Sequence, residues 1–128
     1  MQSIQSQTKS DLVEKNVSEI VLLVGTTKGA FFFFSDTERK HWDVSGPFFL
    51  GSEVYDIKMS YKPNNNILLS LNAPNKRPDI YKTPDLGKTW FHSDLAPYRA
   101  KEKKINKILC LEPVINQKYW YAGTSPAG

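Results

Sequence analysis

Hydrophobic and polar positions alternate along this chain over short stretches that turn residues separate, a pattern typical of β-strands. One such turn, residues 63–66, has the sequence Pro-Asn-Asn-Asn. The pattern predicts strands at residues 20–26, 29–34, 42–45, 54–61, 67–71, 79–82 and 90–94. Residues 1–19 lack an apolar core and are interpreted as a polar N-terminal tail. We therefore expect an all-β chain behind a polar tail.

The eight residues 83–90, Thr-Pro-Asp-Leu-Gly-Lys-Thr-Trp, combine a tight turn with the start of a strand. Asp85 is expected to accept hydrogen bonds from backbone amides two residues on, and Gly87 to take the positive φ that a tight reversal needs. Thr89 and Trp90 favour a strand, and the indole supplies a large area for burial.

A second, degenerate copy of this motif precedes the first by 48 residues, the spacing from Trp42 to Trp90. The alignment places Ser35 opposite Thr83. The copy keeps the Ser and the Trp, but Thr, Arg and His replace its Asp, Gly and Thr. Its turn must therefore be stabilised differently, and we expect Asp36 to cap it.

The strands before each motif are also similar to one another. Residues 21–29 resemble residues 119–126, and a middle copy lies at residues 67–72. In this alignment Gly25 stands opposite Leu71. The chain thus begins three copies of one unit, and the third stops before its own hairpin and motif.

The pattern S/T-x-D-x-G-x-T-W at residues 83–90 resembles the Asp-box of bacterial-neuraminidase-type repeats, a hairpin clasp on the blades of β-propellers in sialidases and sortilin-like receptors. Residues 23–31, Leu-Val-Gly-Thr-Thr-Lys-Gly-Ala-Phe, are similar to the opening of sialidase-like propellers described as glycosyl hydrolases or exo-α-sialidases. The resemblance covers residues 20–128. It implies a partial propeller of four-stranded antiparallel blades, about two blades plus the start of a third.

The first unit offers no candidate for an innermost strand, so the resemblance implies an incomplete Asp-box propeller domain at residues 20–128, the N-terminal piece of a longer protein. Each propeller blade buries its faces against its neighbours. Two blades alone leave apolar faces and strand edges exposed, and we expect the chain to self-associate.

In the implied strand order the box hairpin lies at one end of the blades, and the opposite end surrounds the central channel, where propellers bind ligands. Lys28, Arg77 and Arg99 are the candidates for ligand binding at that end. Glu53 and Tyr55 enter an innermost strand on the same side, and such a pair can act as a general acid/base or as an activated nucleophile.

The resemblance marks a fold rather than an activity. We favour a non-catalytic binding or assembly propeller whose channel end takes a small molecule, a glycan or a protein. The alternative is an exo-α-sialidase-like glycoside hydrolase, which needs paired carboxylates. Only Glu53 is offered here, and the Arg-Ile-Pro motif that catalytic members carry ahead of the first box is lacking. A third possibility is that this chain has no activity of its own.

A formal net charge of +4 raises the question of nucleic-acid binding, since Lys101, Lys103, Lys104 and Lys107 lie close together. A short Lys/Glu-rich run is more typical of a solvated loop, and no recognition helix or RNA-binding signature accompanies it. The apolar stretches have strand length, far below the roughly 20 residues of a membrane helix, and no signal peptide is evident. We interpret the chain as cytoplasmic, without nucleic-acid or membrane partners.

The single Cys110 cannot form an internal disulfide, and no Cys/His cluster has metal-ligand spacing, so neither a metal nor a cofactor is expected. Cys110 lies in the apolar run Ile-Leu-Cys-Leu. We expect it to be a buried structural thiol.

Overall fold

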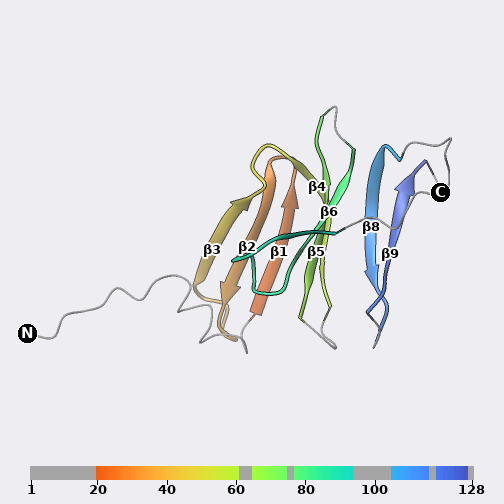
Figure 1. Cartoon of the computed structure of the whole chain (residues 1–128). Coiled ribbons are helices and arrows are strands. Elements are labelled where there is room, and N and C mark those ends of the chain that lie inside the picture. The colour runs from red at the N-terminus through yellow and green to blue at the C-terminus, as the bar shows by residue number, and fades with distance from the viewer. Residues whose placement is uncertain (1–19, 61–64, 75–76, 94–104, 116–117, 127–128) are drawn as a thin grey trace, which may run out of the picture.

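The computed structural model of the chain describes residues 20–60, 65–74, 77–93, 105–115 and 118–126. These residues form nine strands and no helix (Figure 1). The strands are β1 (Ile20–Thr26), β2 (Gly29–Ser35), β3 (Trp42–Phe48), β4 (Glu53–Met59), β5 (Ile67–Asn72), β6 (Asp79–Thr83), β7 (Phe91–Ser93), β8 (Lys107–Pro113) and β9 (Trp120–Ser125). The all-β prediction is confirmed for the described residues, and the predicted N-terminal tail lies outside them.

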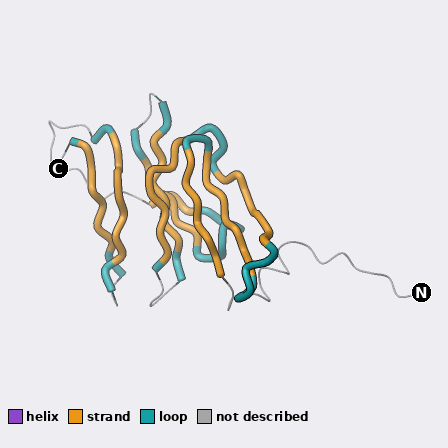
Figure 2. The backbone as a smooth tube through the Cα atoms, turned by 180° about the vertical axis from the view of Figure 1, so that it is seen from behind, coloured by secondary structure: helices purple, strands orange, loops and turns teal. Residues whose placement is uncertain are grey.

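The strands form three antiparallel sheets: β1-β2-β3, β4-β5-β6-β7 and β8-β9. We call these the first, middle and third sheets. They lie face to face in chain order, as the two opposite views show (Figures 1 and 2). The middle sheet is a four-stranded meander, as predicted. β7 begins at Phe91, one residue after the predicted start, and β8 was not among the predicted strands.

Strand β5 is the centre of the molecule, and all six of its residues are buried. Ile67, Leu69 and Leu71 pack toward the first sheet, whereas Leu68 packs toward the third. Full burial of an aliphatic side chain contributes about 1.5–3 kcal/mol, so a strand buried on both faces anchors both neighbours.

The contact between the first and middle sheets is aromatic. The ring of Phe48, at the end of β3, lies 4.8 Å from Phe32 and 5.4 Å from Trp90 between centroids. The ring of Phe49 lies 4.9 Å from Trp90 and 4.7 Å from Tyr81. Such pairs contribute about 0.5–1.5 kcal/mol beyond the burial of their area.

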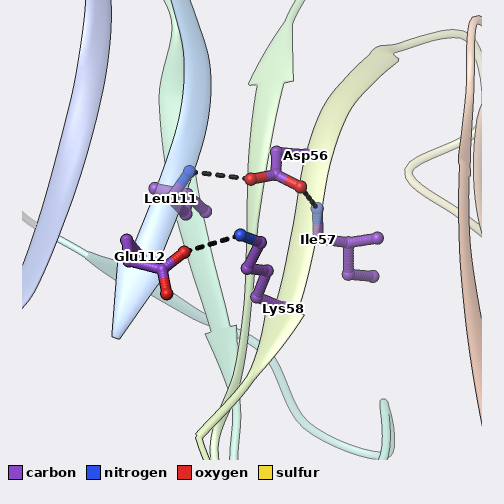
Figure 3. A network of polar contacts seen from close by, with 5 residues as sticks. All are labelled: Asp56, Ile57, Lys58, Leu111 and Glu112. Carbon is purple, nitrogen blue, oxygen red and sulfur yellow. Dashed lines mark hydrogen bonds and ion pairs between the residues drawn. The ribbon is translucent and has the colours of Figure 1, made fainter. Parts of the chain in front are cut away.

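The contact between the middle and third sheets adds polar ties to an aliphatic core. The core consists of Leu68, Ile80, Ile108 and Leu111. Asp56 of β4 accepts a hydrogen bond from the amide of Leu111 at 2.8 Å through Oδ2, and from that of Ile57 at 2.9 Å through Oδ1 (Figure 3).

Two further ties join the same pair of sheets. Asn72 accepts a hydrogen bond from the amide of Ile108 at 3.3 Å and donates to its carbonyl at 3.5 Å. Beside them, Lys58 and Glu112 form an ion pair of 2.7 Å (Figure 3). The third sheet is therefore held by named polar contacts as well as by apolar packing.

The strand registers show a structural repeat. The pairing of β4 with β5 shifts between Val54 and Asp56, and the pairing of β8 with β9 shifts in the same place, between Ile108 and Cys110. Both sheets thus begin with an equivalent bulged strand, and bulges are features that related structures conserve.

The register also corrects the alignment of the first two units. Ile20 stands opposite Ser35, and Ile67 stands opposite Thr83, so the first strands correspond through these pairs. Gly25 is then equivalent to Asn72 rather than to Leu71. The contacts agree, because a Cβ on Gly25 would lie 2.8 Å from Cγ1 of Val54, and Asn72 contacts Ile108, the equivalent of Val54.

Candidate functional site

The turn at residues 83–90 is held by the Asp85 carboxylate. Its Oδ1 accepts hydrogen bonds from the Thr83 hydroxyl and the Thr89 amide, both at 2.8 Å, and its Oδ2 accepts one from the Thr89 hydroxyl at 2.6 Å. The amide two residues on, that of Gly87, donates to the Thr83 hydroxyl at 2.8 Å instead. The predicted hydrogen bond from the Gly87 amide to Asp85 is therefore wrong. The Asp85 carboxylate accepts instead from the amide of Thr89, four residues further along the chain.

This hydrogen-bonding sets the protonation of Asp85. Burial works to raise the pKa of Asp85, but the hydrogen bonds from Thr89 and Thr83 outweigh it and lower the pKa below its ordinary value. A carboxylate that accepts several hydrogen bonds is stabilised in its charged form. The turn is therefore a clasp that depends on an ionised aspartate.

The clasp also packs against the neighbouring sheet. Gly87 has a φ of 89°, and a Cβ there would lie 2.6 Å from the ring of Phe48. Trp90, partly buried, packs among Phe32, Phe48 and Phe49. Its Nε1 is buried without a hydrogen-bond partner among the described residues. Gly87 and Trp90 of the motif therefore contribute to the contact between the first and middle sheets.

The degenerate copy is stabilised differently. The hydroxyl of Ser35 donates to the carbonyl of His41 at 2.5 Å, and Oδ1 of Asp36 accepts from the amide of Arg39 at 2.9 Å. The cap predicted for Asp36 is thus present, and Arg39 takes the positive φ of 56° at the glycine position. Trp42, the equivalent of Trp90, has 41% of its surface exposed.

Glu53 and Tyr55 lie at the start of β4, at the opposite end of the sheet from the clasp. Glu53 is half-buried and Tyr55 is exposed. Tyr55 stands in the β4 bulge, where no residue of β5 opposes it. The two side chains are therefore placed by a bulge rather than by regular alternation.

Lys107, at the start of β8, completes this group and was not singled out as a site residue from the sequence. Its ammonium donates to the Tyr55 hydroxyl at 2.7 Å and lies 5.0 Å from the centre of the Tyr55 ring. The hydrogen bond and the electrostatic interaction with Tyr55 raise the pKa of Lys107, desolvation opposes them, and the charge of Glu53 adds to the increase. The signal in the sequence was the repeat, since Lys107 occupies the position of Glu53 in the next unit.

The remaining ligand-binding candidates are only partly placed. Lys28 lies in the β1–β2 turn, and its carbonyl accepts a hydrogen bond from the amide of Gly51 at 3.2 Å, which puts it at the same end as Glu53. Arg77 is exposed in the β5–β6 connection at that end. Arg99 lies outside the described residues. The structure thus brings together Glu53, Tyr55 and Lys107, with Lys28 and Arg77 at the same strand ends.

Cys110 is exposed, so the prediction of a buried thiol is wrong. The reason is topological. Leu111 points toward the middle sheet and is buried, whereas Cys110 points to the opposite face of the third sheet, over Gly123. An apolar sequence run does not show which of its residues has a neighbouring sheet to bury it.

In the described part of the chain no helix is long and apolar enough to cross a membrane. Nor do the described residues group three His, Cys, Asp or Glu side chains that could hold a metal ion. Comparison with known proteins found no family model that matches the chain and no significant match among curated proteins.

Proposed function

We propose that the chain is part of a sialidase-like Asp-box β-propeller that binds a ligand without chemical conversion, at the strand ends that carry Glu53, Tyr55 and Lys107. The propeller part of the proposal rests on the resemblance of the box. It is supported by the stacking of three antiparallel sheets in chain order, with a complete four-stranded meander in the middle.

The observation that carries the binding function is the meeting of an ammonium, a phenol and a carboxylate at one end of the sheets. Lys107 bonds to the Tyr55 hydroxyl at 2.7 Å, and both side chains are exposed. An exposed aromatic ring beside a cation and hydrogen-bonding groups suits a hydroxylated, negatively charged ligand. We therefore place acidic glycans first among the ligand classes.

The second candidate function is glycoside hydrolysis, and Glu53 is the residue that favours it. A glycosidase needs two carboxyl groups about 5–9.5 Å apart. The Lys107 ammonium interacts electrostatically with Glu53. A cation there stabilises a bound anion but does not replace the second carboxyl group.

Binding and hydrolysis are separated by two probes. Saturation-transfer NMR with 3′-sialyllactose tests binding, and release of fluorophore from 4-methylumbelliferyl α-N-acetylneuraminide tests hydrolysis. We expect saturation transfer from the wild-type chain, at least a tenfold weaker affinity in Lys107→Met, and no fluorophore release. Lys118→Met is the matched control, because Lys118 is exposed at the other end of the third sheet.

Two results would contradict this proposal. Turnover of the fluorogenic substrate that Glu53→Gln abolishes would establish the glycosidase instead. No saturation transfer, or equal weakening by Lys107→Met and Lys118→Met, would remove acidic glycans as the ligand of this end.

A further inference from the structure

Two sheet faces carry exposed apolar side chains that nothing in the described structure covers. On the first sheet, Leu22, Val44 and Trp42 are 50%, 43% and 41% exposed. On the third sheet, Leu109 and Tyr121 are 44% and 72% exposed. We call these the first outer face and the third outer face. Exposed apolar side chains that share one face of a sheet suit an interaction surface.

The first outer face is equivalent to a face that is covered elsewhere in the same molecule. Because Ser35 corresponds to Thr83 and Ile20 to Ile67, Leu22 takes the position of Leu69. Leu69 is fully buried against the first sheet, whereas Leu22 is half exposed. By the same register Phe33 and Trp42 take the positions of Tyr81 and Trp90. The first outer face therefore has the same arrangement of side chains as the face of the middle sheet that packs against the first sheet.

The third outer face has the opposite layout. The shared bulge aligns Cys110 with Asp56 and Glu112 with Lys58, and Tyr121 with Leu68. Asp56 and Leu68 face the third sheet, so their equivalents lie on the side that would contact a following sheet. The described sheets thus present two different outer faces. The first outer face is equivalent to the side of the middle sheet that contacts the first sheet, and the third outer face to the side that contacts the third sheet.

We propose that a second copy of this chain docks head to tail, with the first outer face of one copy on the third outer face of the other. Each copy then repeats across the new contact the arrangement that its own sheets use. A contact between unlike faces is heterologous, and it leaves one face of each kind free, so growth continues until a ring closes or the assembly extends.

The direct test is light scattering after size-exclusion chromatography, on variants that block one face each. Leu22→Glu with Val44→Glu blocks the first outer face, and Tyr121→Glu blocks the third. The wild-type mass should rise with concentration beyond that of a dimer, and each blocked variant should be a monomer. An equimolar mixture of the two variants should give a dimer and nothing larger, because each supplies the face that the other lacks.

Ile115→Glu is the matched control, because Ile115 is 85% exposed but lies in the β8–β9 turn, away from both faces. The Ile115→Glu variant should associate as the wild type does. A wild-type chain that stays monomeric would overturn the proposal. So would a blocked variant that still dimerises, because this would mean contact between like faces.

The exposed Cys110 supplies a second readout that does not require any blocked variant to assemble alone. Its alkylation in the wild type should slow at least threefold as concentration rises, or when excess Tyr121→Glu chain is added, because that variant offers a free first outer face. In the variant with Leu22→Glu and Val44→Glu the rate should be independent of its concentration. A wild-type rate that never changes would contradict the head-to-tail contact even if a variant failed to fold.

Discussion

The middle sheet is covered on both faces, but the two contacts differ in chemistry. Toward the first sheet it meets Phe32, Phe48 and Phe49 through Trp90 and the aliphatic residues of β5. Toward the third sheet it adds the Asp56 carboxylate and the Asn72 amide to a smaller aliphatic core.

The difference shows two ways of fixing one sheet on another. The burial of apolar surface is non-directional, so the first contact uses the clasp at residues 83–90 to position its rings. Hydrogen bonds from a carboxylate or an amide to a neighbouring strand's backbone define the register directly. The third sheet has two described strands and a contact with fewer buried apolar residues, and it depends more on such bonds.

The largest effect should come from the aromatic contact. Phe32→Ala removes a ring that is fully buried between the first and middle sheets. We expect a loss of about 3–5 kcal/mol in the free energy of unfolding, measured by urea denaturation. Phe91→Ala is the control, because Phe91 is 54% exposed and its truncation should be nearly neutral. Equal effects of the two substitutions would show that this contact is not a core.

The polar contact should be weaker and more local. Asp56→Ala leaves the amide of Leu111 without its acceptor in a partly buried place. The expected loss is about 1–3 kcal/mol in the free energy of unfolding, again by urea denaturation. Asp56→Asn, which keeps an acceptor oxygen, should recover part of it. If Asp56→Ala unfolds like the wild type, the carboxylate does not hold the third sheet.

The clasp adds a pH dependence to the aromatic side. Because the pKa of Asp85 is lower in the folded chain, its contribution is fully present above the unfolded pKa of about 3.9 and is lost as the pH falls through the folded value. Stability measured from pH 6 to pH 2 should therefore fall at the acid end, and less steeply in Asp85→Asn. We expect Asp85→Ala to cost about 0.5–2 kcal/mol at pH 7, as for other capping side chains. Identical acid slopes in wild type and Asp85→Asn would contradict this assignment.

The smallest effect should come from the ion pair of Lys58 and Glu112. Both side chains are largely exposed, so salt screens their attraction. Lys58→Met should leave the urea midpoint unchanged within error in 0.5 M NaCl. A large destabilisation at that salt concentration would mean that the pair carries the second contact instead of Asp56 and Asn72.

The sequence predicted the strands of the first and middle sheets and the turn at residues 83–90, because alternation and the box motif are local signals. The turn predicted at residues 63–66 lies partly outside the described residues. The sequence missed β8, because the run Ile-Leu-Cys-Leu hides the alternation and a bulge lies within it. The sequence also singled out Glu53 and Tyr55 as candidate site residues, but not Lys107. The hydrogen bond between Lys107 and Tyr55 joins residues 52 positions apart, which no local pattern predicts.

The polar ties of Asp56 and Asn72 could not be predicted for a related reason. In the sequence Asp56 looks like an ordinary outward-facing polar position of a strand, and Asn72 follows the predicted strand at residues 67–71. Only the position of a neighbouring sheet turns one face of β5 from solvent-exposed to buried, and that position depends on contacts distant in the chain. The prediction for Cys110 was wrong for the same reason, because the sequence does not show which face of β8 a neighbouring sheet covers.

Residue-resolved hydrogen exchange on wild type and Asp56→Ala tests most directly whether the two contacts are separate. Amides exchange through local openings when part of a structure is less stable than the whole. If the two contacts are separate, Asp56→Ala speeds exchange at Ile108 and Leu111 by at least tenfold more than at Phe32 and Phe34. A uniform increase across β2 and β8, or no increase at β8, would contradict this separation.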